Sequence, residues 1–243
     1  MESAPMKAMA PHEIDLERAM DASRTLLGKR IPARLTELNL AMMEIDERHT
    51  REPWRLALSI DFVDAVERHC KQLFATLGQD RVPAAAWLAR NLLELWVWVR
   101  FCGVSRENAW RFHEDALRDA KSMLEAQGQI CEFLGFEDEV SGIAAQETGE
   151  ADSDHLGVGD LGANYLAVAK AATAPGVELG AQFGPLFRSL SRFAHPTAGL
   201  IHGIAHQSEA CRQIQAMFTT QGAYFADQSL LTLEAQFGLP LLP

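Results

Sequence analysis

The chain has 243 residues, of which 48% are hydrophobic and 23% are charged. This is the composition of a globular protein, not of a disordered or collagen-like chain. The 22 basic and 33 acidic residues give a formal net charge of −11. The four cysteines stand at wide, irregular intervals, which is not the spacing of a disulfide framework or a zinc knuckle.

Neither the N-terminal segment nor the most apolar segment is typical of a membrane or export signal. Residues 1–18 lack the apolar core of a secretory signal. Residues 84–104 are interrupted by Arg90, Glu94 and Arg100 and are too polar for a membrane span. We therefore expect a cytoplasmic protein with reduced thiols and no membrane contact.

The charge is unevenly distributed along the chain. Segment 122–169 contains ten acidic residues and no Lys or Arg, whereas segment 179–208 contains no acidic residue. The basic and histidine residues of the second segment are Arg188, Arg192, His195, His202 and His206. This segment is where we expect a phosphate-bearing ligand to bind, although an ordinary helical surface gives the same pattern.

Residue composition and spacing predict helices almost throughout the chain. Two helices are expected at residues 12–28 and 34–48. A third surface helix is predicted by apolar residues at intervals of three and four. These residues are Leu56, Ile60, Val63, Val66, Cys70, Leu73, Phe74 and Leu77.

The next predicted helix, residues 83–101, is apolar on nearly every side, so we expect it at the centre of the fold. Arg90 and Glu94 interrupt its apolar surface. They lie four residues apart, so they can pair on one side of this helix.

The remaining segments predict further helices and one long loop. Residues 107–133 form a long helix, and the acidic, glycine-rich residues 135–162 are mainly loop. Helices are expected at residues 160–172 and 177–194, where His195-Pro196 ends the second. Residues 206–237 form one long helix or two, with Gly222 at the expected kink.

We therefore predict an all-α bundle of about seven to nine helices. Residues 1–50 form an N-terminal helical extension for packing or dimerisation, and residues 51–243 form the bundle. The whole chain makes one compact domain.

The predicted helix 177–194 carries the strongest candidates for chemistry. Its apolar residues form one stripe, and Arg188 and His195 lie within about 20° of each other on the opposite side, about 10 Å apart along the axis. Ser191 and Arg192 flank that face. An imidazole can act as a general acid or base close to neutral pH, and an arginine can hold a phosphate.

The segment FRSLSRFAHPTA (187–198) resembles a signature of the HEPN-like helical bacterial proteins. Arg188 and His195, with six residues between them, resemble the Arg and His of the family motif, and Arg90 with Glu94 resembles its upstream pair. The resemblance covers about residues 82–218. It implies a helical bundle, which in active members is a metal-independent, dimeric endoribonuclease of a toxin or phage-defence system.

The resemblance also implies a mechanism and partners. His195 would move protons at the ribose 2′-hydroxyl or the leaving 5′-oxygen, Arg188 would stabilise the transition state, and Arg192 would hold the RNA backbone. Arg90 and Glu94 would orient these groups. The implied partners are RNA or another phosphate-bearing ligand, a second copy of the chain, and a protein antidote; no cofactor or metal is expected.

Other interpretations remain open. The chain can instead be a non-catalytic helical module that binds a protein or a small ligand, in which Arg90, Glu94 and His195 are structural. A weaker alternative is a metal site formed by His202, His206 and Glu209. A calcium site would use acidic-loop residues, namely Asp152, Asp154, His155 and Asp160. Trp87, Trp96, Trp98 and Trp110 are interpreted as core residues, not as a stacking platform for bases.

Overall fold

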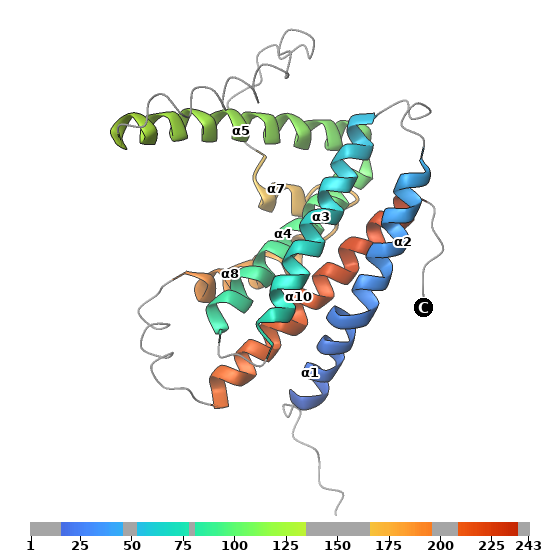
Figure 1. Cartoon of the computed structure of the whole chain (residues 1–243), viewed down its shortest axis with the longest axis vertical. Coiled ribbons are helices and arrows are strands. Elements are labelled where there is room, and N and C mark those ends of the chain that lie inside the picture. Colours follow the sequence, from blue (N-terminus) through green and yellow to red (C-terminus); the bar gives the residue numbers. More distant parts are fainter. Residues whose placement is uncertain (1–15, 46–52, 78–80, 135–165, 196–208, 238–243) are drawn as a thin grey trace, which may run out of the picture.

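The computed structural model describes residues 16–45, 53–77, 81–134, 166–195 and 209–237, and all regular structure in these segments is helical (Figure 1). The predicted all-α bundle is therefore confirmed for the described part of the chain. The helical elements are α1 (Leu16–Thr25), η1 (Leu26–Arg30), α2 (Ile31–Glu44), α3 (Pro53–Ala75), α4 (Val82–Val104), α5 (Arg106–Leu134), α7 (Val168–Ala172), α8 (Gly180–Ala194) and α10 (Glu209–Gln236).

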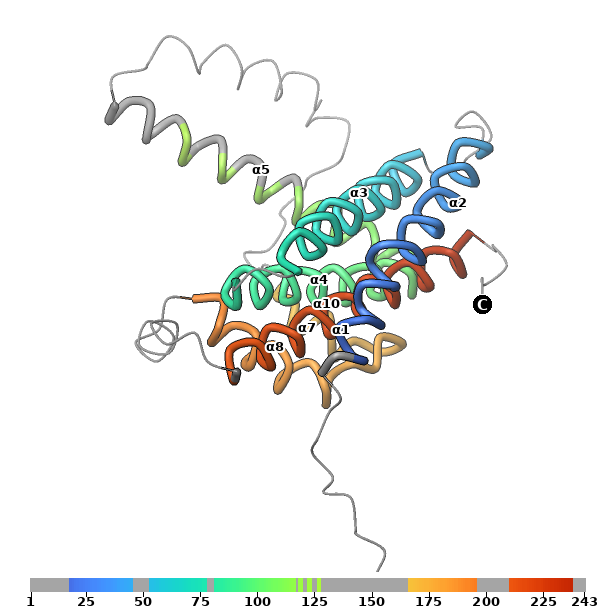
Figure 2. The backbone as a smooth tube through the Cα atoms, turned by 60° about the horizontal axis from the view of Figure 1, so that its bottom comes forward, coloured from blue at the N-terminus to red at the C-terminus, as the bar shows by residue number. Residues whose placement is uncertain are grey.

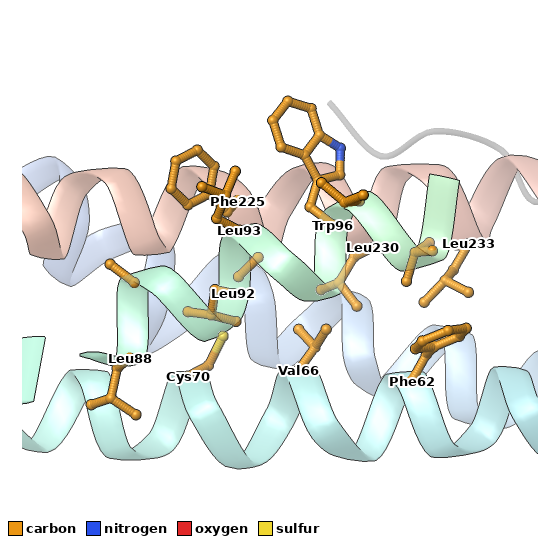
Figure 3. Packing of buried hydrophobic residues seen from close by; sticks show 14 of the residues in the cluster. Phe62, Val66, Cys70, Leu88, Leu92, Leu93, Trp96, Phe225, Leu230 and Leu233 are labelled. Carbon is orange, nitrogen blue, oxygen red and sulfur yellow. The ribbon is translucent and has the colours of Figure 1, made fainter. Parts of the chain in front are cut away.

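Helix α4 is the central element of the bundle, as its sequence predicts. It packs against α10, α8, α3 and α5. In Figure 3, α4 runs between α3 and α10, and its side chains point to both neighbours. Leu92 lies beside Cys70 of α3, and the ring of Trp96 stacks on Phe225 of α10 with 5.8 Å between centroids. Burial of these apolar groups is what holds the three helices together.

Leu16 to Glu44 form one continuous helix, so the prediction of two separate helices at residues 12–28 and 34–48 is wrong. The chain passes from α1 through the π-helical turn η1 into α2 without a break. The Ile31 N–H donates to the Leu26 carbonyl, a five-residue spacing. Pro32 has no N–H to give the usual four-residue bond, and the wider turn accommodates it. The helix therefore continues through Gly28 and Pro32.

Residues 16–45 of the predicted N-terminal extension, the part that the structure describes, pack into the common core. Leu27, Ile31, Leu35, Leu38 and Met42 all belong to the same buried cluster as the residues of α4 and α10. Figure 2 shows α1 and α2 lying along α10. This segment therefore contributes directly to the main bundle.

Arg34 lies on the same buried face of α2, with a side chain 4% exposed. Its Nη1 is 3.2 Å from Asp227 Oδ1 and 3.8 Å from Glu234 Oε2, both on α10. Burial raises the pKa of Glu234, Arg34 lowers it, and the negative charge of Asp227 adds to the rise. Sequence reasoning missed this buried charge cluster. Its one signal is a basic residue at a position where the spacing of Ile31, Leu35 and Leu38 demands an apolar one.

Several smaller predictions for the helices differ from the structure. In α3, Ile60 and Phe74 are exposed, although the predicted apolar stripe includes them. Trp87 of α4 is 46% exposed, so its interpretation as a core residue is wrong. Helix α10 is unbroken at Gly222, so the expected kink is absent. The missing side chain instead permits close helix packing, because a Cβ there would lie 2.6 Å from Leu73 Cδ2 and 3.2 Å from Ala89 Cα.

Helix α5 starts against the end of α4 and runs away from the bundle (Figures 1 and 2). Near its start, the Phe112 ring packs on Trp98 of α4 and on Phe62 of α3. Farther along, Asp115 accepts a hydrogen bond of 2.7 Å from the Leu166 N–H, which fixes the chain leading into α7. Within the described segments, no helix has both the length and the apolar character needed to cross a membrane.

Candidate functional site between α4 and α8

Helix α8 presents the predicted candidates Arg188, Ser191, Arg192 and His195. It ends at Ala194, and His195 is extended at φ −101° and ψ 147°, as expected for the residue before a proline. The apolar stripe of the helix is anchored in the core by three buried residues, Leu179, Phe183 and Leu190. Arg188, Arg192 and His195 are exposed.

Arg90 of α4 makes the contacts that define the site. Its Nε donates to Glu94 Oε1 at 3.0 Å, which confirms the pairing predicted from their spacing. Its Nη1 lies 3.1 Å from His195 Nε2. Its guanidinium also lies over the Phe187 ring, 4.7 Å from the centroid. One arginine therefore joins the candidate histidine, the acidic partner and an aromatic ring of α8.

The contact with Arg90 determines which nitrogen of His195 accepts a hydrogen bond. A guanidinium has only donors, so Nε2 of His195 must accept the hydrogen bond. This arrangement fits the tautomer of His195 that carries its proton on Nδ1. Because its acceptor nitrogen is occupied, His195 can take a proton through Nε2 only after Arg90 has moved away.

Unlike His195, Arg188 and Arg192 make no polar contact in the part of the chain that the structure describes. Both side chains are exposed, and within the described residues neither takes part in a hydrogen bond or an ion pair. The structure thus joins His195 to Arg90 instead of to Arg188. The two exposed guanidinium groups add positive charge to α8 and are available to an anionic ligand.

Ser191 contributes a further polar group to the side of α8 that faces α4. It is four residues after Phe187 and four before His195, so the three share one face of the helix. Its Oγ is buried and has no hydrogen-bond partner among the described residues. A buried hydroxyl without a partner is costly, so this group is suited to bond to a ligand that enters beside Arg90.

The opposite flank of the same α4 face carries a second polar cluster, which sequence reasoning missed. His69 of α3 donates from Nδ1 to the Ala65 carbonyl at 2.7 Å, and its Nε2 accepts from Asn91 Nδ2 at 3.3 Å. The exposed Trp87 ring lies 6.1 Å from the His69 ring at an angle of 33°. The available signal was the spacing of Trp87, Asn91 and Glu94, which places them on the face that also carries Arg90.

The remaining candidates do not join this site. His202 and His206 lie outside the described residues, as do Pro196, Thr197 and the whole acidic segment 135–165; Glu209 begins α10. In the segments that are described, no group of three or more metal-binding side chains is present. Burial raises the thiol pKa of both Cys70 and Cys102 to about 12, which makes them poor nucleophiles.

No family model matches the chain, and comparison with curated proteins and with solved structures gives no match. The HEPN-like family therefore stays a prediction from the motif residues.

Proposed function

We propose that the chain is a HEPN-like, metal-independent endoribonuclease whose site lies between α4 and α8. The observation that carries this proposal is the arrangement of the basic side chains and His195 on α8. Arg188 and Arg192 are exposed and unpaired in the described structure, while His195 at the end of the same helix is held by Arg90. Two unpaired cations on the helix that ends at His195 are suited to bind an RNA phosphate, and an imidazole can move the protons that its transfer involves.

The chemistry needs no metal. Nε2 of His195 removes the proton of a ribose 2′-hydroxyl, and O2′ attacks the adjacent phosphorus. The bond from phosphorus to the 5′-oxygen breaks, and the products are a 2′,3′-cyclic phosphate and a 5′-hydroxyl. Arg188 stabilises the charge that develops on the phosphate oxygens, and Arg192 holds the neighbouring backbone.

The same reaction explains how Arg90 leaves His195. A guanidinium binds two phosphate oxygens through paired N–H groups, a stronger interaction than one neutral imidazole provides. When the phosphate draws Arg90 toward itself, Nε2 becomes free to accept a proton. Glu94 keeps one side of the guanidinium fixed during this change, and Ser191 offers its hydroxyl to the phosphate.

A second proton donor is needed for the 5′-oxygen that leaves. In our proposal another copy of the chain supplies it, so the active form is a homodimer with two sites in one cleft. A protein antidote that covers this cleft would inhibit the enzyme.

The experiment measures cleavage of a labelled RNA pool in EDTA by the wild type, His195→Ala and Arg188→Ala. Arg111→Ala, which removes an exposed arginine from α5, is the matched control. The expected result is cleavage by the wild type and by Arg111→Ala, with new 2′,3′-cyclic ends, and a loss of at least about 100-fold in the other two. Absence of cleavage by the wild type, or retained activity in both site variants with circular dichroism unchanged, would overturn the proposal.

A second candidate function is a non-catalytic module that binds a protein or a small ligand. The observation in its favour is that Arg90 already occupies the acceptor nitrogen of His195 and so joins α8 to α4. In that case Arg90→Ala lowers the unfolding free energy by about 1 kcal/mol, and the wild type does not cleave RNA. RNA cleavage that depends on His195 would exclude this alternative.

A further inference from the structure

Trp87 stands out among the tryptophans of the chain. All five lie in the described residues, and the other four are buried or half-buried, whereas Trp87 is 46% exposed. It lies on α4, whose other faces are buried in the core. An exposed indole offers a flat aromatic face on which another ring can stack.

The Trp87 ring is supported from one side by a rigid neighbour. The His69 imidazole lies 6.1 Å away, and both of its nitrogens are fixed by hydrogen bonds, to the Ala65 carbonyl and to Asn91. The imidazole therefore packs against one side of the indole and limits its movement on that side. The exposed part of the indole is the surface on which a flat ring could stack.

Trp87 also lies close to the phosphate site proposed above. It precedes Arg90 by three residues on α4, so the two are neighbours on one helix face, about 4.5 Å apart along the axis. This separation suits a base and the phosphate next to it. Asn91, one residue beyond Arg90, keeps its amide oxygen free of the His69 contact and can bond to the edge of a base.

We propose that Trp87 is a stacking platform for one base of single-stranded RNA, whose neighbouring phosphate lies at Arg90 and His195. This inference rests on the proposed function and adds the substrate class. In a duplex the bases are stacked on each other and cannot reach an indole, whereas an unpaired strand can place a base on it. The protein therefore binds and cleaves unpaired RNA, and not duplex RNA.

The experiment measures binding of a labelled single-stranded 2′-O-methyl oligonucleotide, which cannot be cleaved because it has no 2′-hydroxyl. Fluorescence anisotropy gives the Kd of the full chain at several salt concentrations. The variants are Trp87→Ala, Trp87→Leu and Trp87→Phe. Tyr224→Ala is the matched control, because Tyr224 is an aromatic residue of α10 that is 49% exposed.

The expected result separates stacking from charge. Trp87→Ala and Trp87→Leu weaken binding about tenfold without changing its salt dependence, while Trp87→Phe and Tyr224→Ala bind within about threefold of the wild type. Arg188→Ala instead lowers the slope of log Kd against log salt by about 0.7. The duplex form of the oligonucleotide binds more weakly than the single strand in the wild type.

The outcomes distinguish this inference from the proposed function. If the wild type binds the single strand through Trp87 but does not cleave RNA, the nuclease proposal is wrong and the stacking site stands. If the wild type cleaves RNA while Trp87→Leu binds and cleaves normally, the stacking site is wrong and the nuclease stands. Absence of single-strand binding by the wild type at low salt also overturns the stacking site. Trp87→Leu keeps an apolar side chain, so it remains informative where Trp87→Ala fails to fold.

Discussion

Arg90 and His195 are joined across two helices by one hydrogen bond, with Nη1 of the arginine 3.1 Å from Nε2 of the histidine. Because arginine can only donate, we expect His195 to be the neutral tautomer protonated on Nδ1. Nitrogen-15 NMR of histidine-labelled protein measures this directly at a pH where the imidazole is neutral. A resonance typical of an Nε2–H tautomer in the wild type would contradict the structure.

His69 provides the control for this experiment. Its Nδ1 donates to Ala65 and its Nε2 accepts from Asn91, so it should show the same tautomer for a different reason. Arg90→Ala should alter the nitrogen shifts of His195 and leave those of His69 unchanged. Asn91→Ala should do the reverse.

Arg34→Met is expected to destabilise the protein strongly. The substitution leaves Asp227 and Glu234 facing each other on α10 without the buried guanidinium that lies between α2 and α10. Loss of one partner from a buried ion cluster costs about 3–5 kcal/mol. Urea denaturation gives the free energy of unfolding.

The control for Arg34 is Arg24→Met on the same continuous helix. Arg24 pairs with Asp21 at 2.9 Å, but both side chains are more than half exposed. An exposed pair of this kind contributes about 0.5 kcal/mol or less. Equal effects of the two substitutions would show that burial of Arg34 has no energetic importance.

Glu234 should make stability depend on pH in a defined direction. Burial raises its folded-state pKa above 4.5, so the folded state binds its proton more readily than the unfolded state. Its contribution to stability is therefore greatest below about pH 4.5 and decreases as pH rises through the folded-state pKa. The unfolding free energy of the wild type minus that of Glu234→Gln should fall over this range. A difference that rises with pH would contradict the effect of burial.

Gly222→Ala should destabilise the bundle by about 1–3 kcal/mol, because a methyl group would press on Leu73 and on the backbone of Ala89. Gly184→Ala in α8 is the control. Apart from its chain neighbours and the backbone of its own helix, no atom lies within 4 Å of its added Cβ. The better helix propensity of alanine is offset by the proline that follows, so the change stays below about 1 kcal/mol. Thermal unfolding followed by circular dichroism measures both. A Gly222→Ala protein as stable as the wild type would show that α10 can shift away from α3 and α4.

The sequence by itself determined the local features of this protein. Spacing of apolar residues predicts the helices, and the all-round apolar character of α4 predicts its central position. The Arg90 and Glu94 pair follows from a separation of four residues, and the end of α8 at His195 follows from the proline after it. These features depend on residues within a single helix, whose order and spacing are given by the sequence.

Only the tertiary structure decided which distant groups meet. Arg90 and His195 are 105 residues apart, and their contact depends on how α8 crosses α4. The burial of Arg34 depends on α10, and the exposure of Trp87 depends on which neighbours pack against the α4 face. Helix periodicity identifies a face but not its partner, because many helix arrangements bury the same apolar stripe. The sequence therefore identifies the residues of the candidate site one by one, but only the packing of α4 against α8 brings them together.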